Sequence, residues 1–251
     1  MRLTKKVAIV TGAGSGFGEG IAKRFAQEGA NVVVNDINMA GGERVVREIA
    51  AVGGNALFSP GDVGRDGDVA ALIRCALDGF GDLDIVVNNA GVTHRNQPML
   101  DVAEEEFDRI YRVNVKSLFL TARYAVPHFR KKKSGVFITI ASTAGVRPRP
   151  GLTWYNGSKG AAIVTSRSMA AELAPYNIRV NVINPVAGET GLLAEFMGGD
   201  TPELRAKFIA TIPLGRLSQP SDIATAAVFF ASDEAAFITG ACLEVDGGRC
   251  V

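Results

Sequence analysis

Lys6–Thr11 (KVAIVT) leads directly into Thr11–Gly18 (TGAGSGFG), and the fold follows from these two adjoining stretches. The first is a short apolar run rich in β-branched residues, which is typical of a buried strand. After the glycine-rich stretch, Phe17–Glu28 has its apolar residues on one helical face. A strand, a glycine-rich turn and a helix in this order predict the first unit of an α/β fold with a parallel sheet.

The glycine-rich turn has small residues where the phosphates of a dinucleotide would approach the chain. Gly12 permits the tight turn, Gly16 lets the backbone come close to a pyrophosphate, and Gly18 lets helix and strand pack closely. The helix N-terminus adds free N–H groups and the positive end of the helix dipole. We therefore expect Gly12, Ser15, Gly16, Phe17 and Gly18 to contact a dinucleotide cofactor.

An acidic residue at the end of the second strand indicates which dinucleotide is bound. Asp36 follows the strand Asn31–Asn35, eighteen residues after Gly18. Its carboxylate would accept hydrogen bonds from the adenosine ribose hydroxyls and would repel a 2′-phosphate. The neighbouring candidates for a phosphate partner, Ser15 and Ile37, are uncharged, so we expect NAD rather than NADP, with Asp36 and Ile37 in contact with it. The alternative is that Asp36 only caps the second helix.

Short apolar runs and helical patterns alternate along the rest of the chain. After the second strand, the pattern predicts strands at Asn55–Ser59, Asp84–Asn88, Gly135–Ala141, Ile178–Asn184 and Ala241–Asp246, and helices at Gly41–Ala51, Asp66–Phe80, Glu104–Arg130 (one extended helix), Tyr155–Ala174 and Ser221–Ala231. Strands without polar alternation suit a sheet covered on both faces. We expect a doubly wound, seven-stranded parallel sheet of the Rossmann type, in the order 3-2-1-4-5-6-7, with helices on both faces.

The whole chain, residues 1–251, is predicted to form one domain, because no linker, repeat or low-complexity tract divides it. Its longest irregular region is 185–220, which we expect to form one or two short helices as a lid over the active site. The alternative for this region is a disordered insertion.

Composition excludes several classes of protein. Hydrophobic residues make up 47% and charged residues 21%, which is unlike a disordered chain, and a net charge of +1 offers no field for nucleic acid or an anionic membrane. Three cysteines and two histidines without metal-ligand spacing argue against a zinc site or a disulfide framework. No apolar signal region precedes the first strand, and no run approaches the ~18–20 apolar residues of a membrane helix. We expect a cytoplasmic protein without a metal.

Several motifs together resemble the short-chain dehydrogenase/reductase family, over essentially the whole chain. The matching pieces, in order, are TGAGSGFG (11–18), Asp62-Val63, NNAG (88–91), Asn114, Ser142, YNGSK (155–159) and the segment from Asn184-Pro185 to Thr190. The resemblance implies an NAD(P)-dependent oxidoreductase that acts on CH–OH groups. Asp62 and Val63 would then lie beside the adenine ring, although alone they would be interpreted as a turn.

Tyr155 and Lys159 are the candidate acid/base pair of such a reaction. They are four residues apart on one helix and so share a face. A tyrosine has a reference pKa of about 10, and the lysine cation together with the oxidised nicotinamide would favour the phenolate. Ser142, at a strand end, would hold the substrate oxygen. Asn114 is implied by the resemblance to hold a water that links the lysine to solvent. Alone, Ser142 would be interpreted as a loop serine and Tyr155 as a core tyrosine.

The resemblance also implies contacts with the nicotinamide half of the cofactor. Asn89, Ala90 and Gly91 would lie near its ribose, Lys159 and Tyr155 would bond that ribose, and Pro185 and Thr190 would lie at the carboxamide. The family often has Pro-Gly where this chain has Pro185-Val186. Valine is less permissive in backbone angle, so the path to Thr190 is expected to differ locally, with Gly188 supplying the freedom.

The substrate is expected to be a small alcohol or its carbonyl product, and basic residues near the site suggest that it could be anionic. These are Arg95, Arg147 and Arg149, with His94, Asn96 and Trp154 nearby. The alternative is that the arginines pair with Glu189, Glu195 or Asp200, or face another subunit. We expect a secondary alcohol, hydroxy acid or sugar as substrate.

Three other functions remain open from the sequence. A 3-oxoacyl-carrier-protein reductase is the main alternative, although such enzymes usually use NADPH and have basic residues near the glycine turn. A non-catalytic dinucleotide-binding regulator is more distant, because the Asn-Ser-Tyr-Lys set is intact. A methyltransferase would share the doubly wound sheet but does not need the Tyr155/Lys159 pair.

Assembly into a homotetramer is expected. The helix Tyr155–Ala174 has more apolar residues than one sheet-facing stripe needs, and the last strand would leave an open sheet edge that a second subunit can cover. Members of the family are commonly tetramers with two-fold symmetry. The alternative is a dimer formed through the long helices alone.

Overall fold

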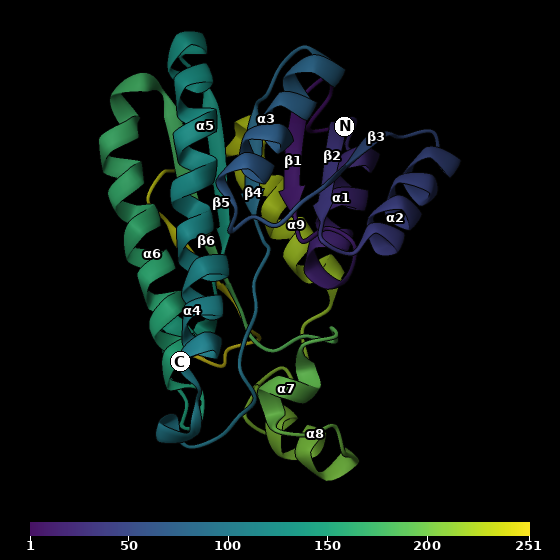
Figure 1. Ribbon diagram of the computed structural model, residues 1–251. Helices are drawn as coiled ribbons and strands as arrows, with labels where there is room; N and C mark the ends of the chain where they lie inside the picture. Colours follow the sequence, from purple (N-terminus) through teal and green to yellow (C-terminus); the bar gives the residue numbers. More distant parts are fainter.

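Seven short segments form one parallel sheet in the computed structural model, which describes residues 1–251. The strand order is β3-β2-β1-β4-β5-β6-β7, as the sequence predicted (Figure 1). The strands are β1 (Val7–Thr11), β2 (Asn31–Asp36), β3 (Asn55–Pro60), β4 (Ile85–Asn88), β5 (Gly135–Ile140), β6 (Ile178–Pro185) and β7 (Cys242–Val245). The order reverses direction between β1 and β4, so their carboxyl ends form the switch point where ligands bind in such sheets.

The sheet is buried on both faces, which explains why its strands lack polar alternation. In β1, Ala8 and Val10 belong to one apolar cluster and Val7 and Ile9 to the other, and all four are buried. Successive side chains of a strand point to opposite faces. Both faces therefore need cover, and helices supply it.

Two helical layers cover the sheet (Figure 1). The helices α1 (Gly16–Gln27), α2 (Met39–Ala51) and α9 (Pro220–Ala231) contribute to one apolar cluster, and α3 (Asp66–Phe80), α5 (Ser117–Lys132) and α6 (Thr153–Leu173) contribute to the other. On the second face, the Phe129 ring of α5 meets Phe137 of β5 edge-on, with 5.3 Å between centroids. None of the helices is long and apolar enough to span a bilayer.

The segment expected as one helix over Glu104–Arg130 is interrupted. It consists of α4 (Glu104–Tyr111), a π-helical turn η2 (Arg112–Lys116) and α5. A π-turn inserts one extra residue into the helical ladder, and such turns often lie at functional sites. This turn contains the buried Asn114. A single inserted residue barely alters the apolar periodicity, so the sequence pattern does not reveal it.

The segment after β6 forms a separate lobe at the carboxyl ends of the strands. It contains two short helices, α7 (Leu193–Met197) and α8 (Pro202–Ile209), which lie apart from the two helical layers (Figure 1). The lobe has its own small apolar cluster, made of Val186, Leu193, Phe208, Ile212 and Leu217. The expected one or two short helices in 185–220 are thus α7 and α8, packed on an apolar cluster of their own.

A substitution at Gly18 tests whether the close approach of α1 to Gly12 and Asn89 stabilises the fold. A Cβ atom at this position would lie 2.2 Å from the Gly12 carbonyl oxygen and 2.4 Å from Asn89 Nδ2. Because the first obstacle is backbone, we expect Gly18→Ala to lower the free energy of unfolding by about 1–3 kcal/mol. The measurement is urea unfolding at a fixed protein concentration.

Gly67→Ala is the matched control for this change. Gly67 lies in α3 with no atom within 4 Å of an added Cβ. Alanine should therefore be neutral or stabilise the helix by up to about 1 kcal/mol. Equal unfolding midpoints for the two variants would show that the close approach at Gly18 is unimportant.

Candidate active site

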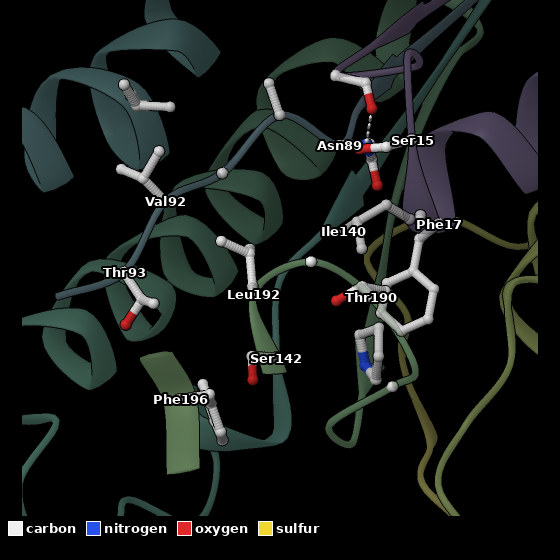
Figure 2. Close-up of a pocket in the computed structure, with 18 of the residues that line it drawn as sticks. Ser15, Phe17, Asn89, Val92, Thr93, Ile140, Ser142, Thr190, Leu192 and Phe196 are labelled. Carbon is white, nitrogen blue, oxygen red and sulfur yellow. Dashed lines mark hydrogen bonds between the residues drawn. The ribbon is translucent and has the colours of Figure 1, made fainter. Parts of the chain in front are cut away.

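A cavity of about 360 Å³ lies at the carboxyl ends of the strands and extends to the lobe. In Figure 2, Ser15, Phe17 and Thr190 lie at one side of the view, and Thr93 and Phe196 at the other. Sixteen of the expected site residues line it: Gly12, Ser15, Gly16, Phe17, Asp36, Ile37, Asp62, Val63, Asn89, Ala90, Gly91, Ser142, Tyr155, Lys159, Pro185 and Thr190. Two expected residues, Gly18 and Asn114, do not line it and lie behind its wall.

The glycine-rich turn gives the cavity an uncapped helix N-terminus. Gly12 and Gly16 have φ angles of +61° and +57°, a region that favours glycine. Ser15 precedes α1 but its side chain makes no capping hydrogen bond. The first N–H groups of α1 therefore lack side-chain partners beside the cavity, which suits an anion such as a phosphate.

The ends of β1 and β4 are joined by side-chain hydrogen bonds. Thr11 Oγ1 accepts from the N–H groups of Asn89 and Ala90, each at 3.0 Å, and donates to the Val87 oxygen at 3.2 Å. Asn89 Nδ2 donates to the oxygens of Thr11 and Gly12 at 2.8 and 3.1 Å. The sequence analysis gave Thr11 no role. The only feature of the sequence that could have indicated this role is that Thr11 ends the first strand, as NNAG (88–91) ends the fourth.

Asp36 is bound to the glycine-rich turn. One carboxylate oxygen accepts from the Gly14 N–H and the other from the Asn38 N–H, both at 2.8 Å. The residue that caps α2 is Asn38, whose side chain accepts from the Gly41 N–H. The alternative that Asp36 only caps the second helix is therefore wrong.

A cation near this turn, Arg44, is already fully partnered. Its guanidinium bonds Glu19 at 2.6 Å, Glu48 at 3.0 Å and the Gly14 oxygen at 3.1 Å. The hydrogen bond from Arg44 is the main cause of the lowered pKa of Glu19. Sequence reasoning did not single out Arg44, because the contact depends on how α2 packs against α1.

Tyr155 and Lys159 lie side by side on α6 and are 8% and 6% exposed. The Lys159 ammonium lies 5.8 Å from the centre of the Tyr155 ring and donates to the Ile140 oxygen at 3.0 Å. Burial raises the pKa of Tyr155 to about 12, against a lowering by the Ser142 hydrogen bond. Burial also lowers the pKa of Lys159 to about 8.

The expected lowering of the tyrosine pKa relied on two cations, Lys159 and the oxidised nicotinamide. In this buried site, desolvation disfavours the charged form of both side chains. The expected phenolate therefore stays a prediction for the site with both cations present.

The Asn114 side chain forms hydrogen bonds with the backbone beside the cavity and none directly with Lys159. Its side chain accepts from the Val92 N–H and donates to the Val92 oxygen, both at 2.9 Å, and it also donates to Ser158 Oγ at 3.0 Å. Gly91 leaves a space next to it. A Cβ atom there would lie 3.3 Å from Lys159 Nζ and 3.4 Å from Asn114 Oδ1.

Asp62 has a mainly local role in addition to lining the cavity. Its carboxylate pairs with Arg112 of the π-turn and accepts from the Gly64 N–H at 2.8 Å. Burial opposes ionisation, but the hydrogen bonds from Arg112 and Gly64 outweigh it and lower the pKa of Asp62. The π-turn thus supports the third strand end as well as Val92.

The departure from Pro-Gly after β6 leaves Thr190 at the cavity. The Val186 N–H donates to the Val245 oxygen at 3.4 Å, and Thr190 lies beside the glycine-rich turn, 3.2 Å from where a Cβ on Gly16 would be. Gly188 has no positive φ angle. A Cβ on it would lie 2.3 Å from Phe17 Cζ, so Gly188 provides space for that ring, and the expectation that it supplies backbone freedom is wrong.

Apolar residues beyond the expected ones also line the cavity, one of them Phe196 at the same end as Thr93 (Figure 2), and sequence reasoning missed them. These residues include Val92, Val113, Ile140, Leu192, Leu193 and Phe196. The Phe196 ring of α7 meets Tyr155 edge-on, with 5.6 Å between centroids. No motif marks these residues, because the position of α7 depends on how the lobe packs.

The expected substrate-reading residues do not line this cavity. His94 is buried, with Nδ1 2.8 Å from the Arg95 oxygen, and Trp154 donates to the Met99 oxygen. Arg95, Asn96, Arg147 and Arg149 are also absent from the lining. The proposed acidic partners do not pair with them either: Glu189 and Asp200 pair with Arg205. No group of three or more His, Cys, Asp or Glu side chains is arranged as a metal site.

Known proteins resemble this chain over its full length. A family model described as Enoyl-(Acyl carrier protein) reductase matches residues 12–249. The 4-formylbenzenesulfonate dehydrogenase of Comamonas testosteroni is 52% identical over 99% of both chains. The 7alpha-hydroxysteroid dehydrogenase of Escherichia coli (strain K12) is 40% identical over 99% of this chain and 95% of that protein.

A solved structure shares the fold closely. The 3-ketoacyl-(acyl-carrier-protein) reductase from Brucella melitensis, complexed with NADH, is 48% identical, with a TM-score of 0.93 over 99% of this chain and 100% of that one. The extent of these matches and the order of the seven strands lead to one assignment: this chain belongs to the short-chain dehydrogenase/reductase family of nicotinamide-dependent oxidoreductases, and with its dehydrogenase relatives it is an oxidoreductase of CH–OH groups.

Proposed function

We propose that the protein is an NAD-dependent dehydrogenase of an alcohol carried on an apolar ring. The observation that carries this proposal is the composition of one cavity. A buried Tyr155, Lys159 and Ser142 line it together with an uncapped helix N-terminus and Asp36. Acid/base and dinucleotide-binding groups that share one cavity suit hydride transfer.

The cofactor contacts follow from the cavity lining. The N–H groups at the start of α1, near Ser15, Gly16 and Phe17, would bind the pyrophosphate. Ile37, Asp62 and Val63 would flank the adenosine, and Asn89, Ala90, Gly91, Pro185 and Thr190 the nicotinamide half. Gly18 would act indirectly, by letting α1 approach Gly12. When bound, the oxidised nicotinamide supplies the hydride acceptor.

Tyr155 would take the proton of the substrate hydroxyl, with Ser142 holding the same oxygen. Lowering the pKa of Tyr155 from about 12 towards neutrality requires about 1.4 kcal/mol per unit. In a buried site, the Lys159 ammonium acting with a second positive charge can supply such an amount. The value of about 12 already includes the lowering of the Tyr155 pKa by the Ser142 hydroxyl.

A proton route from Lys159 towards Asn114 is part of the proposal. The space beside Gly91 lies within hydrogen-bonding reach of both Lys159 Nζ and Asn114 Oδ1. A water there would have two polar partners, which is the minimum for an ordered water. Asn114 would hold this relay through its bonds to Val92.

The apolar lining of the cavity supports a ring-bearing alcohol over a sugar. Leu192, Leu193 and Phe196 offer no hydrogen bonds to a sugar's hydroxyl groups. The names of two relatives also contain a ring compound: 4-formylbenzenesulfonate, an aromatic aldehyde, in one and a 7alpha-hydroxysteroid, a cyclic alcohol, in the other. We propose that the segment 185–220, which contributes these residues, acts as a lid over the substrate.

A 3-oxoacyl-carrier-protein reductase remains the second candidate, favoured by the similarity to the Brucella melitensis reductase. Against it, the net charge of +1 gives no basic field for an acidic carrier protein. A faster turnover of an acetoacetyl thioester with NADH than of any alcohol with NAD would favour this candidate.

Replacing Tyr155 by phenylalanine tests the acid/base assignment. The ring stays and only the hydroxyl is lost, so cofactor binding should persist while turnover falls by several orders of magnitude. The measurement is NADH absorbance during oxidation of cyclic and aromatic alcohols, with cofactor binding followed by fluorescence titration. Turnover within about tenfold of the unmodified protein would contradict the mechanism.

The choice between NAD and NADP depends on Asp36. The Asp36 carboxylate accepts a hydrogen bond from the glycine-rich turn. Arg44, a cation that also bonds this turn, already pairs with Glu19 and Glu48. We expect a strong preference for NAD, and a shift towards NADP in Asp36→Ala combined with Ile37→Arg. The measurement is kcat/KM with each cofactor at one ionic strength. An unmodified protein that prefers NADP would refute this assignment.

The outward faces of two helices support assembly into a homotetramer. Phe119 of α5 and Val164 of α6 are 57% and 65% exposed, and β7 is an edge strand with a partly exposed Leu243. We expect a particle near four times 26.4 kDa, measured by light scattering on a sizing column. A monomer would refute the assembly, and a dimer would leave one interface only.

The cytoplasm is the proposed location. Three free cysteines, Cys75, Cys242 and Cys250, fit a reducing compartment.

A further inference from the structure

Three arginines gather beside the active-site cavity without an acidic partner. Arg147, Arg149 and Arg249 line a second, small cavity, and none of them forms an ion pair, while nearby acids pair with Arg205. Arg147 donates to the Arg249 carbonyl oxygen at 2.6 Å. Like charges held together without a counter-ion repel one another, so this arrangement favours an anion.

Arg149 is the most deeply set of the three. Its Nη1 atom is buried and has no hydrogen-bond partner. The guanidinium lies 4.2 Å from the centre of the Phe208 ring and 5.5 Å from that of Phe196. Burial and the charge of Arg249 lower the pKa of Arg149 to about 10, so it remains a cation at neutral pH. Arg149 is half-buried, and a cationic side chain whose buried donor has no partner is costly unless a ligand satisfies that donor.

The small cavity adjoins the active-site cavity at Phe196. Its volume of about 10 Å³ has room for roughly one water. Phe196 and Val186 line both cavities. One neighbour of the Phe196 ring is Tyr155 and another is the Arg149 guanidinium. Phe196 therefore lies between Tyr155, at the reacting end of the site, and the guanidinium of Arg149.

Phe196 lies on a short helix that is flanked by glycines. The helix α7 has five residues, is preceded by Gly191 and is followed by Gly198 and Gly199, of which Gly198 has a φ of +79°. Glycines at both ends of a short helix allow it to shift at little steric cost. A displaced Phe196 ring would join the two cavities into one.

We propose that Arg149, supported by Arg147 and Arg249, binds a sulfonate or carboxylate carried by the substrate at the end of its ring away from the reacting hydroxyl. This inference rests on the proposed function and gives it a substrate class, an anionic ring-bearing alcohol or its carbonyl product. The planar guanidinium can donate two parallel hydrogen bonds to two oxygens of such a group.

A binding experiment tests the site without turnover. Benzenesulfonate is titrated calorimetrically into the protein in the presence of NAD. Arg149→Met keeps an apolar chain against the two phenylalanines and removes the charge, so its Kd should rise at least about tenfold. Arg205→Met is the matched control, because Arg205 is an equally charged residue of the lobe that already pairs with Asp200. It should leave the Kd unchanged.

A turnover experiment tests whether the anion belongs to the substrate. The ratio of kcat/KM for 4-(hydroxymethyl)benzenesulfonate to that for 4-methylbenzyl alcohol should fall at least about tenfold in Arg149→Met. The neutral alcohol should be oxidised equally by both proteins. Arg149→Lys keeps the charge but loses the planar guanidinium. Its kcat/KM ratio should lie between those of the unmodified protein and Arg149→Met, and it keeps the test valid if the methionine variant does not fold.

Each result separates this proposal from the function on which it rests. An unchanged Kd for benzenesulfonate, or an equal loss on both alcohols, overturns the anion site; the equal loss would instead fit an anion from a second copy, such as its C-terminal carboxylate. Failure of the proposed function would appear as no NAD reduction by the unmodified protein with any alcohol, and the titration would then still decide the site.

Discussion

The hydrogen bonds between Thr11 and Asn89 are the constraint on which the site depends. They tie the ends of β1 and β4 together at the point where the strand order reverses. With these ends fixed, α1 can begin directly at Gly16, close enough to Asn89 that Gly18 cannot carry a side chain. The cavity wall and the free helix N-terminus are thus parts of one corner held by protein hydrogen bonds and close packing.

The π-turn gives the opposite wall a similar support. By inserting one residue into a long helix, it lets Asn114 bond both backbone groups of Val92 while Arg112 reaches Asp62. An ordinary helical turn satisfies its own backbone and offers no such reach. The interruption therefore connects the helix layer to two strand ends, β3 and β4, on either side of the switch point.

The sequence predicted those features of the fold and site that depend on residues close together in the chain. Buried strands, the glycine-rich turn and the spacing of Tyr155 and Lys159 could be read from the sequence, because each depends on neighbours within a few residues. The π-turn, the Thr11 hydrogen bonds and the position of Phe196 could not, since they arise where segments distant in the chain meet. The pKa directions at Tyr155 and Lys159 could not be predicted for the same reason, because the depth of burial is a property of the packed molecule.

The buried Lys159 also makes the site a weak point of the fold. An unfolded lysine has a pKa near 10.4, whereas burial holds this one at about 8. Between these values the unfolded chain binds a proton that the native protein does not, so unfolding takes up a proton and stability rises with pH across that interval. At neutral pH both states carry the charge, and the native protein bears the full cost of keeping it away from water. Reactivity at this position is therefore maintained at the expense of folding stability.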